Sequence, residues 1–176
     1  MKMEMIFSGF GGQGALTIGR FVAQAAMLEG KNVSWLPSYG PEMRGGTANV
    51  FTIVSDKAIA SPLVSNPDLV VALNQPSLDK FGPTVKAGGL IIVNEDICPN
   101  IVKRDDVKYI LVKLNTIASQ VGSAKVLNMI PIGIIIKQLG LITYPSIEKA
   151  LREAMGEKDA KLLELNLKAV KAGMEL

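Results

Sequence analysis

Two almost continuous apolar runs, at residues 68–74 and 89–94, constrain the fold of this chain more than any other feature. A strand that is apolar along its whole length is covered on both faces, as in a parallel sheet between helix layers. Further β-branched, apolar runs occur at residues 3–8, 32–36, 47–54 and 107–112. Helical stretches separate several of these runs, and this alternation is typical of an α/β layer fold.

The helical segments become dominant in the last third of the chain. Apolar periodicity and end signals predict helices over residues 14–28, 123–139, 147–155 and 159–172. The second of these should bend at Pro131, and Ser146 should cap the third. A chain of 176 residues suits one core rather than two. We therefore expect residues 1–176 to form a single three-layer α/β/α domain with a mixed, mostly parallel sheet and a helical C-terminal third.

The chain contains no histidine and a single cysteine, Cys98. Catalytic triads and dyads that use histidine are excluded, as are zinc sites that contain it. One thiol cannot ligate an iron–sulfur cluster, close an internal disulfide or form a CxxC pair, and we expect Cys98 to be a small buried filler. We predict no catalytic residue and no metal site, so the chain depends on partners for chemistry or works by binding.

Charge and hydropathy narrow the possible partners and the location. Lysine and arginine exceed the acidic residues by only 19 to 16, without a basic stripe interleaved with aromatic residues, which argues against nucleic acid. The N-terminus lacks the pattern of a signal peptide. The longest apolar run, residues 126–142, is interrupted by polar residues and is shorter than the roughly 20 apolar residues of a membrane span. We expect a cytoplasmic protein that binds neither nucleic acid nor a membrane.

A glycine loop follows the first predicted strand, with the sequence Gly9-Phe10-Gly11-Gly12-Gln13-Gly14. It satisfies G-x-G-x-x-G, in which glycines allow close backbone approach and the helix N-terminus attracts an anion. A dinucleotide site also needs an acidic residue at the end of the second strand, about 20 residues further on. The nearest acid, Glu42, lies beyond Gly40-Pro41 in a separate loop. The fingerprint is half met, which favours a structural turn or a different phosphate-bearing ligand; a free-standing dinucleotide-binding oxidoreductase is the alternative.

A second loop carries an arginine between two predicted strands. Its candidate site residues are Ser38, Tyr39, Gly40, Pro41, Glu42, Arg44, Gly45 and Gly46. The loop follows the carboxyl end of a strand, where open α/β sheets bind ligands. The guanidinium of Arg44 beside two glycines suits phosphate or carboxylate, although an ordinary loop in which Arg44 pairs with a glutamate is the alternative.

Two smaller motifs are weaker candidates. Asn74 leaves an apolar strand and is expected to cap the turn that follows. Ser61-Pro62 either lines the same sheet edge as the loops or makes a simple turn.

In combination, these segments resemble the gamma subunit of 2-oxoacid:ferredoxin oxidoreductases. The resemblance rests on the glycine loop, the second loop with Asn49, Ser61-Pro62-Leu63, residues 68–81 and residues 88–94. It continues into Asn128-Met129 and the terminal helices, so it covers essentially the whole chain. The second loop with Asn49 is most similar to the 2-oxoglutarate and 2-oxoisovalerate members.

The resemblance implies a complex that oxidatively decarboxylates a 2-oxoacid to an acyl-CoA and reduces ferredoxin, using thiamine diphosphate, Mg²⁺ and iron–sulfur clusters. It implies alpha, beta (thiamine-binding) and delta (ferredoxin-like) subunits as partners, and a gamma chain associated with coenzyme A access. The two loops would then face coenzyme A or other subunits. The chain has no Gly-Asp dipeptide, with which thiamine motifs begin, so we expect no cofactor bound by this chain alone. A non-enzymatic binding module of the same fold is a third hypothesis.

Overall fold

The computed structural model describes residues 1–39 and 46–176, apart from the side chains of Glu157 and Lys158. Within these residues six strands form one sheet in the order β2-β3-β1-β4-β5-β6. The strands are β1 (Lys2–Phe10), β2 (Asn32–Tyr39), β3 (Thr47–Ser55), β4 (Leu69–Ala72), β5 (Leu90–Asn94) and β6 (Lys108–Val112). Only β3 runs against the others, because it pairs antiparallel with both β1 and β2. The predicted mixed, mostly parallel sheet is confirmed.

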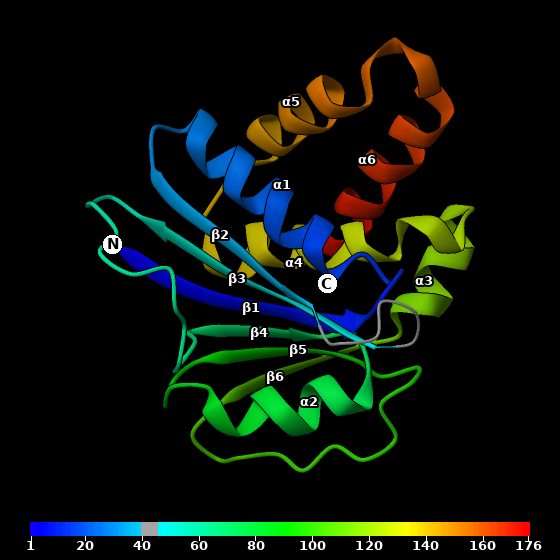
Figure 1. Ribbon diagram of the computed structural model, residues 1–176. Helices are drawn as coiled ribbons and strands as arrows, with labels where there is room; N and C mark the ends of the chain where they lie inside the picture. Colours follow the sequence, from blue (N-terminus) through cyan, green and yellow to red (C-terminus); the bar gives the residue numbers. More distant parts are fainter. Residues whose placement is uncertain (40–45) are drawn as a thin grey trace.

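Helices cover both faces of the sheet, as predicted for three layers. One face carries α1 (Ala15–Leu28), α3 (Leu114–Val121), α4 (Ile130–Leu139), α5 (Tyr144–Met155) and α6 (Ala160–Met174). The other face carries α2 (Gln75–Phe81), which is followed by the short 3₁₀ helix η1 (Gly82–Thr84). Figure 1 shows α2 below the sheet and α1, α5 and α6 above it. The helical C-terminal third is therefore confirmed.

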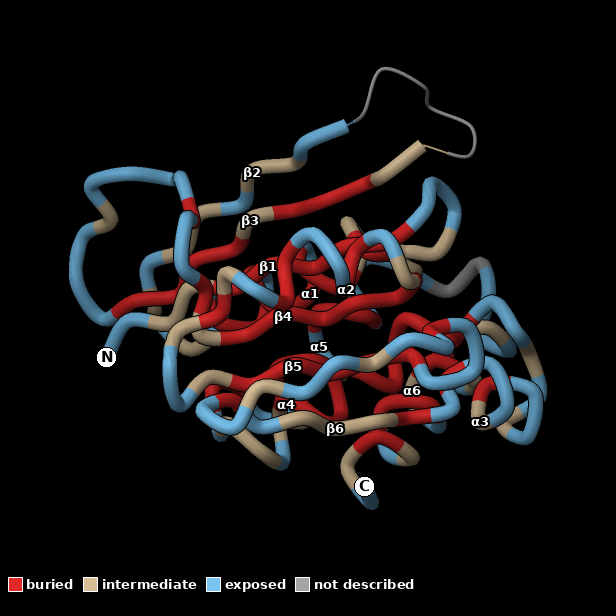
Figure 2. The backbone as a smooth tube through the Cα atoms, turned by 90° about the horizontal axis from the view of Figure 1, so that it is seen from below, coloured by how far each residue is buried: buried red, intermediate tan, exposed pale blue. Residues whose placement is uncertain are grey.

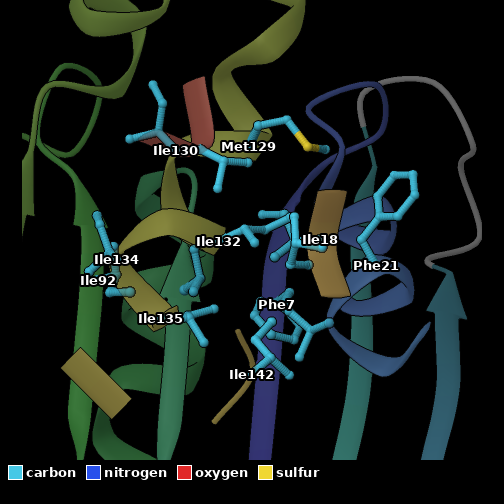
Figure 3. Packing of buried hydrophobic residues seen from close by; sticks show 14 of the residues in the cluster. Phe7, Ile18, Phe21, Ile92, Met129, Ile130, Ile132, Ile134, Ile135 and Ile142 are labelled. Atoms are coloured by element: carbon cyan, nitrogen blue, oxygen red, sulfur yellow. The ribbon is translucent and has the colours of Figure 1, made fainter. Parts of the chain in front are cut away.

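Alternate side chains of each central strand enter separate cores. Phe7 of β1 and Ile92 of β5 belong to the larger core under α1 and α4–α6, whereas Ile6 and Val93 belong to the core under α2. Figure 3 shows isoleucines of α4 gathered beside Ile92 and Phe7. Every residue of β4 and β5 is buried, as Figure 2 shows, which explains why these strands read as continuous apolar runs.

Two glycines let α4 and α6 cross with their backbones in contact. A Cβ added at Gly133 would lie 2.0 Å from the carbonyl oxygen of Val170, and one at Gly173 would lie 2.0 Å from that of Ile130. The 3₁₀ helix η2 (Ala124–Met129) leads directly into α4. This close crossing therefore anchors η2, which lies beside the glycine loop.

The structure corrects two of the helix predictions. Residues 123–139 form η2 followed by α4 rather than one bent helix, and Pro131 is the second residue of α4, where its missing N–H costs nothing. Ser146 is not a cap: α5 begins at Tyr144 after Thr143, and Ser146 lies in its first turn. The following helix, predicted over residues 159–172, is capped by the side chain of Asp159 and ends at Met174.

Two helices escaped prediction. Helix α2 has seven residues and α3 has eight, so each offers only about two turns in which apolar periodicity could be recognised.

Among the described residues, no single helix is long and apolar enough to cross a membrane. The segments Leu114–Val121 and Ala124–Leu139 meet the length and composition criteria only when joined, across a bend of 117°.

Candidate functional site at the carboxyl edge of the sheet

The glycine loop connects the carboxyl end of β1 to the start of α1. Gly12 and Gly14 adopt φ values of 91° and 84°, the left-handed region that favours glycine. The amide of Gly11 donates a 3.1 Å hydrogen bond to the carbonyl oxygen of Gly46, just before β3. The structure thus brings the glycine loop together with one end of the second loop.

The N-terminus of α1 is uncapped. Its N-cap is Gly14, which has no side chain to accept from the helix, and the first turn contains no acidic residue. Among the described residues, the amide hydrogens of Ala15, Leu16 and Thr17 have no backbone acceptor. These donors and the positive end of the helix dipole make the site attractive to an anion.

Two pockets flank this helix terminus and share Gly12, Gly14 and Thr17. The first, here called the loop pocket, has a volume of about 400 Å³ and is lined on its apolar side by Phe10, Leu16 and Tyr39. The second, the amide pocket, has a volume of about 410 Å³ and is lined on its polar side by Gln13, Asn115, Lys125 and Asn128. A ligand with apolar and anionic parts could occupy both sides of the loop.

Asn128 is aimed at the loop from η2. The residue is only 9% exposed, and its Nδ2 would lie 2.5 Å from a Cβ added at Gly14. No hydrogen bond joins its amide to any residue in the described part of the chain. The exposed Lys125 brings a positive charge to the same pocket. Neither residue was predicted, although a lone asparagine within an apolar run was the available signal.

Gln13 occupies the space between the ends of β1 and β4. Its Oε1 accepts hydrogen bonds from the Phe10 amide at 2.6 Å and from Asn74 Nδ2 at 3.3 Å. Its Nε2 donates to the carbonyl oxygen of Leu73 at 3.3 Å. The side chain therefore ties the glycine loop to the neighbouring strand end.

Further amides and hydroxyls extend this contact across the sheet edge. Asn74 Oδ1 accepts from the Ser77 amide at 2.9 Å, which confirms Asn74 as the cap of α2. Ser8 Oγ bonds Ser77 Oγ at 2.7 Å and Asn49 Oδ1 at 2.5 Å. Asn94 Nδ2 donates to Asn115 Oδ1 at 2.8 Å, and its Oδ1 accepts from the Leu114 amide at 3.3 Å. We call these uncharged residues the amide network: Ser8, Gln13, Asn49, Asn74, Ser77, Asn94 and Asn115.

The other predicted site residues are placed less uniformly. Ser38 and Tyr39 end β2 with exposed side chains, and Tyr39 reaches the loop pocket. Gly40, Pro41, Glu42, Arg44 and Gly45 lie outside the described residues.

Ser61 and Pro62 are not brought to the site. They lie in the connection from β3 to β4, which begins and ends at the opposite edge of the sheet. Ser61 Oγ accepts from the Leu63 amide, so the motif makes a local turn.

Cys98 lies on the α2 side of the sheet, in the smaller core. It is 2% exposed, and burial raises the pKa of its thiol to about 11. A thiol of this kind is not ionised near neutral pH and acts as a filler. Within residues 1–39 and 46–176, no three acidic or cysteine side chains lie close enough together to hold a metal ion.

The topology differs from that of a dinucleotide-binding half-domain. There the second strand pairs in parallel with the first, so that its terminal acid reaches the ribose. Here β3 lies between β1 and β2, and β2 is at the edge of the sheet. The glycine loop therefore lacks the neighbour that the fingerprint requires.

Comparison with known proteins identifies relatives of this chain. Residues 4–176 match the family of pyruvate ferredoxin/flavodoxin oxidoreductases. The chain is 38% identical over 176 residues to the ketoisovalerate oxidoreductase subunit VorA of Methanothermobacter marburgensis, covering 99% of this chain but only 36% of that subunit. It is 32% identical to the 2-oxoglutarate synthase subunit KorC of Methanocaldococcus jannaschii, covering all of this chain and 94% of that one.

Solved structures give the same answer. The gamma subunit of a keto/oxoacid ferredoxin oxidoreductase from Geobacter sulfurreducens superposes with a TM-score of 0.83 at 31% identity, covering 98% of this chain and 96% of that one. The 2-oxoglutarate:ferredoxin oxidoreductase of Magnetococcus marinus shares the fold with a TM-score of 0.90 at 20% identity, over 99% of this chain and 30% of that one. The chain therefore belongs to the pyruvate ferredoxin/flavodoxin oxidoreductase family, as a gamma subunit of the 2-oxoacid:ferredoxin oxidoreductases.

Proposed function

We propose that this chain, as a single gamma-type domain, helps to bind coenzyme A in a cytoplasmic complex with alpha, beta and delta subunits. The complex would decarboxylate a 2-oxoacid, 2-oxoglutarate or 2-oxoisovalerate, to its acyl-CoA and reduce ferredoxin. Thiamine diphosphate, Mg²⁺ and iron–sulfur clusters in the partners would supply the carbanion and electron-transfer chemistry. The names of the relatives support this proposal, although the chain spans only about a third of VorA.

The uncapped N-terminus of α1 is the observation that carries the coenzyme A assignment. Coenzyme A is a substrate with several phosphate groups, and unpaired helix N–H groups are suited to phosphate. The amides of Ala15, Leu16 and Thr17 would donate to a phosphate, and Gly12 and Gly14 would let it approach the backbone. The Magnetococcus marinus structure of the same fold is described with coenzyme A and succinyl-CoA bound.

We assign a role in coenzyme A binding to residues that line each pocket. Lys125 would compensate phosphate charge, and the Asn128 amide would hydrogen-bond a phosphate or hydroxyl oxygen. The loop pocket, with Phe10 and Tyr39, would take an apolar part of the ligand.

The second loop would act beside the first, since Gly11 and Gly46 are hydrogen-bonded. Arg44 would contact a coenzyme A phosphate or hold a subunit interface. Omitting this chain, or replacing Arg44 with alanine, should weaken coenzyme A-dependent dye reduction or assembly; undiminished turnover without the chain would refute its role.

A charge reversal at Thr17 tests phosphate binding most sharply. Thr17 is the third residue of α1, a position at which a glutamate favours the helix. In the assembled complex, Thr17→Glu should raise the KM for coenzyme A by about tenfold, the equivalent of about 1.4 kcal/mol, because it places a like charge beside the phosphate. The KM for the 2-oxoacid should not change.

Thr17→Gln is the matched control, because it has the same size without the charge. It should raise the KM for coenzyme A by much less than Thr17→Glu does. Equal KM values for the two variants would contradict a phosphate at this helix terminus.

A further inference from the structure

The side chain of Gln13 fills the space between the carboxyl ends of β1 and β4. In an open α/β sheet, ligands bind where successive connections leave for opposite faces. Here β1 leads to α1 on one face and β4 leads to α2 on the other (Figure 1). Gln13 lies at this point, with hydrogen bonds to the Phe10 amide, Asn74 Nδ2 and the Leu73 carbonyl oxygen.

Gly9, the first glycine of the loop, has no side chain and so leaves space for Gln13. A Cβ added at Gly9 would lie 2.7 Å from Gln13 Oε1 and 3.0 Å from the Cβ of Leu73. The backbone at Gly9 is ordinary strand, so a left-handed conformation does not require glycine there. The space next to Gly9 is needed for the Gln13 amide, and the two residues form a coupled pair.

This pairing separates the two sides of the glycine loop. Gln13 closes the inner side of the loop and also lines the amide pocket, while the outer side presents Gly12, Gly14 and the first amides of α1 to both pockets. We infer that Gln13 is a positioning residue that holds the loop in the conformation needed for coenzyme A, with Gly9 as its packing partner. This inference rests on the proposed function of the loop.

The inference predicts a separation of kinetic constants in the assembled complex. Gln13→Ala should raise the KM for coenzyme A by about three- to tenfold, the equivalent of one neutral hydrogen bond, and change kcat by less than about twofold. Gln13→Glu keeps the size and the acceptor but loses the donor to Leu73, and should also raise this KM. Gln24→Met, on an exposed position of α1, is the control and should change neither constant.

A double-mutant cycle with Gly9→Ala tests the coupling. Gly9→Ala alone should raise the KM for coenzyme A, because its methyl group displaces Gln13. In the Gln13→Ala background the same change should add little. Additive effects, or Gln13 variants that lower kcat and leave the KM unchanged, would overturn the inference. If Thr17→Glu raises the KM while the Gln13 variants do not, only this inference fails; if Thr17→Glu is also silent, the proposed function fails.

Discussion

The amino ends and the carboxyl ends of the parallel strands are held together by different chemistry. We call these two sides of the sheet the amino edge and the carboxyl edge. At the amino edge, Lys86 Nζ bridges Glu4 at 2.8 Å and Asp68 at 3.1 Å. At the same end of the molecule, Glu29 at the end of α1 accepts from Lys31 and from both the amide and hydroxyl of Thr143. At the carboxyl edge, the amide network makes equivalent connections without a charged residue.

This difference separates the residues that stabilise the fold at the amino edge from those that leave the carboxyl edge free to bind an anion. Each ion pair near the surface remains hydrated and contributes little to the free energy of folding. Such pairs can therefore lie exposed at the amino edge. A largely buried network of neutral groups holds the glycine loop, and none of its members carries a charge. Among the described residues, those that line the amide pocket therefore offer an anion helix amides and Lys125, and no carboxylate.

Introducing a charge into the neutral network should have the largest effect. Asn94 is fully buried and uses its amide to reach Leu73, Leu114 and Asn115. Asn94→Asp would place an unpaired carboxylate there and lower the free energy of unfolding by about 3 kcal/mol or more, measured by urea denaturation. The converse change at the amino edge, Asp68→Asn, should cost about 1 kcal/mol or less. Equal losses would break the comparison.

Acid should act on the amino edge, with an intermediate effect. Burial alone would raise the pKa of Glu29, but hydrogen bonds from Ser146, the Thr143 amide and Lys31 outweigh it and lower the pKa to about 2. Because this value lies below the unfolded value of 4.5, the stabilisation is present above pH 4.5 and is lost as pH falls toward 2.

Replacement of Glu29 by glutamine isolates this contribution. Glu29→Gln should lower the free energy of unfolding at neutral pH by about 1–3 kcal/mol, the value of hydrogen bonds to a charged group. It should also flatten the loss of stability between pH 4.5 and 2 in thermal unfolding. An acid profile as steep as that of the unchanged chain would contradict this assignment.

The surface ion pairs should give the smallest effect. Lys86 is 41% exposed, so Lys86→Met should cost about 0.5–1 kcal/mol in low salt. The cost should shrink further in about 1 M salt, where the Debye length is roughly 3 Å. A large, salt-independent loss would show that this edge is not held by screened charges.

The sequence predicted the sheet well because its central strands are apolar throughout, which indicates a sheet covered on both faces. It also placed the glycine loop and the Asn74 cap, since both depend on residues that are adjacent in the chain. Asn128 stood out as a polar residue within an apolar run, but no local pattern showed that η2 packs beside the glycine loop and brings Asn128 and Lys125 to it. The antiparallel insertion of β3 was equally invisible, and it decides against a dinucleotide site.

Hydrogen exchange of the assembled complex, with and without coenzyme A, tests the central claim most directly. If the uncapped start of α1 holds a phosphate of coenzyme A, the amides of Ala15, Leu16 and Thr17 should exchange more slowly when it is bound. Pantetheine, which lacks phosphate, should give no such protection. Unchanged exchange at these three amides in saturating coenzyme A, or equal protection by pantetheine, would contradict the account.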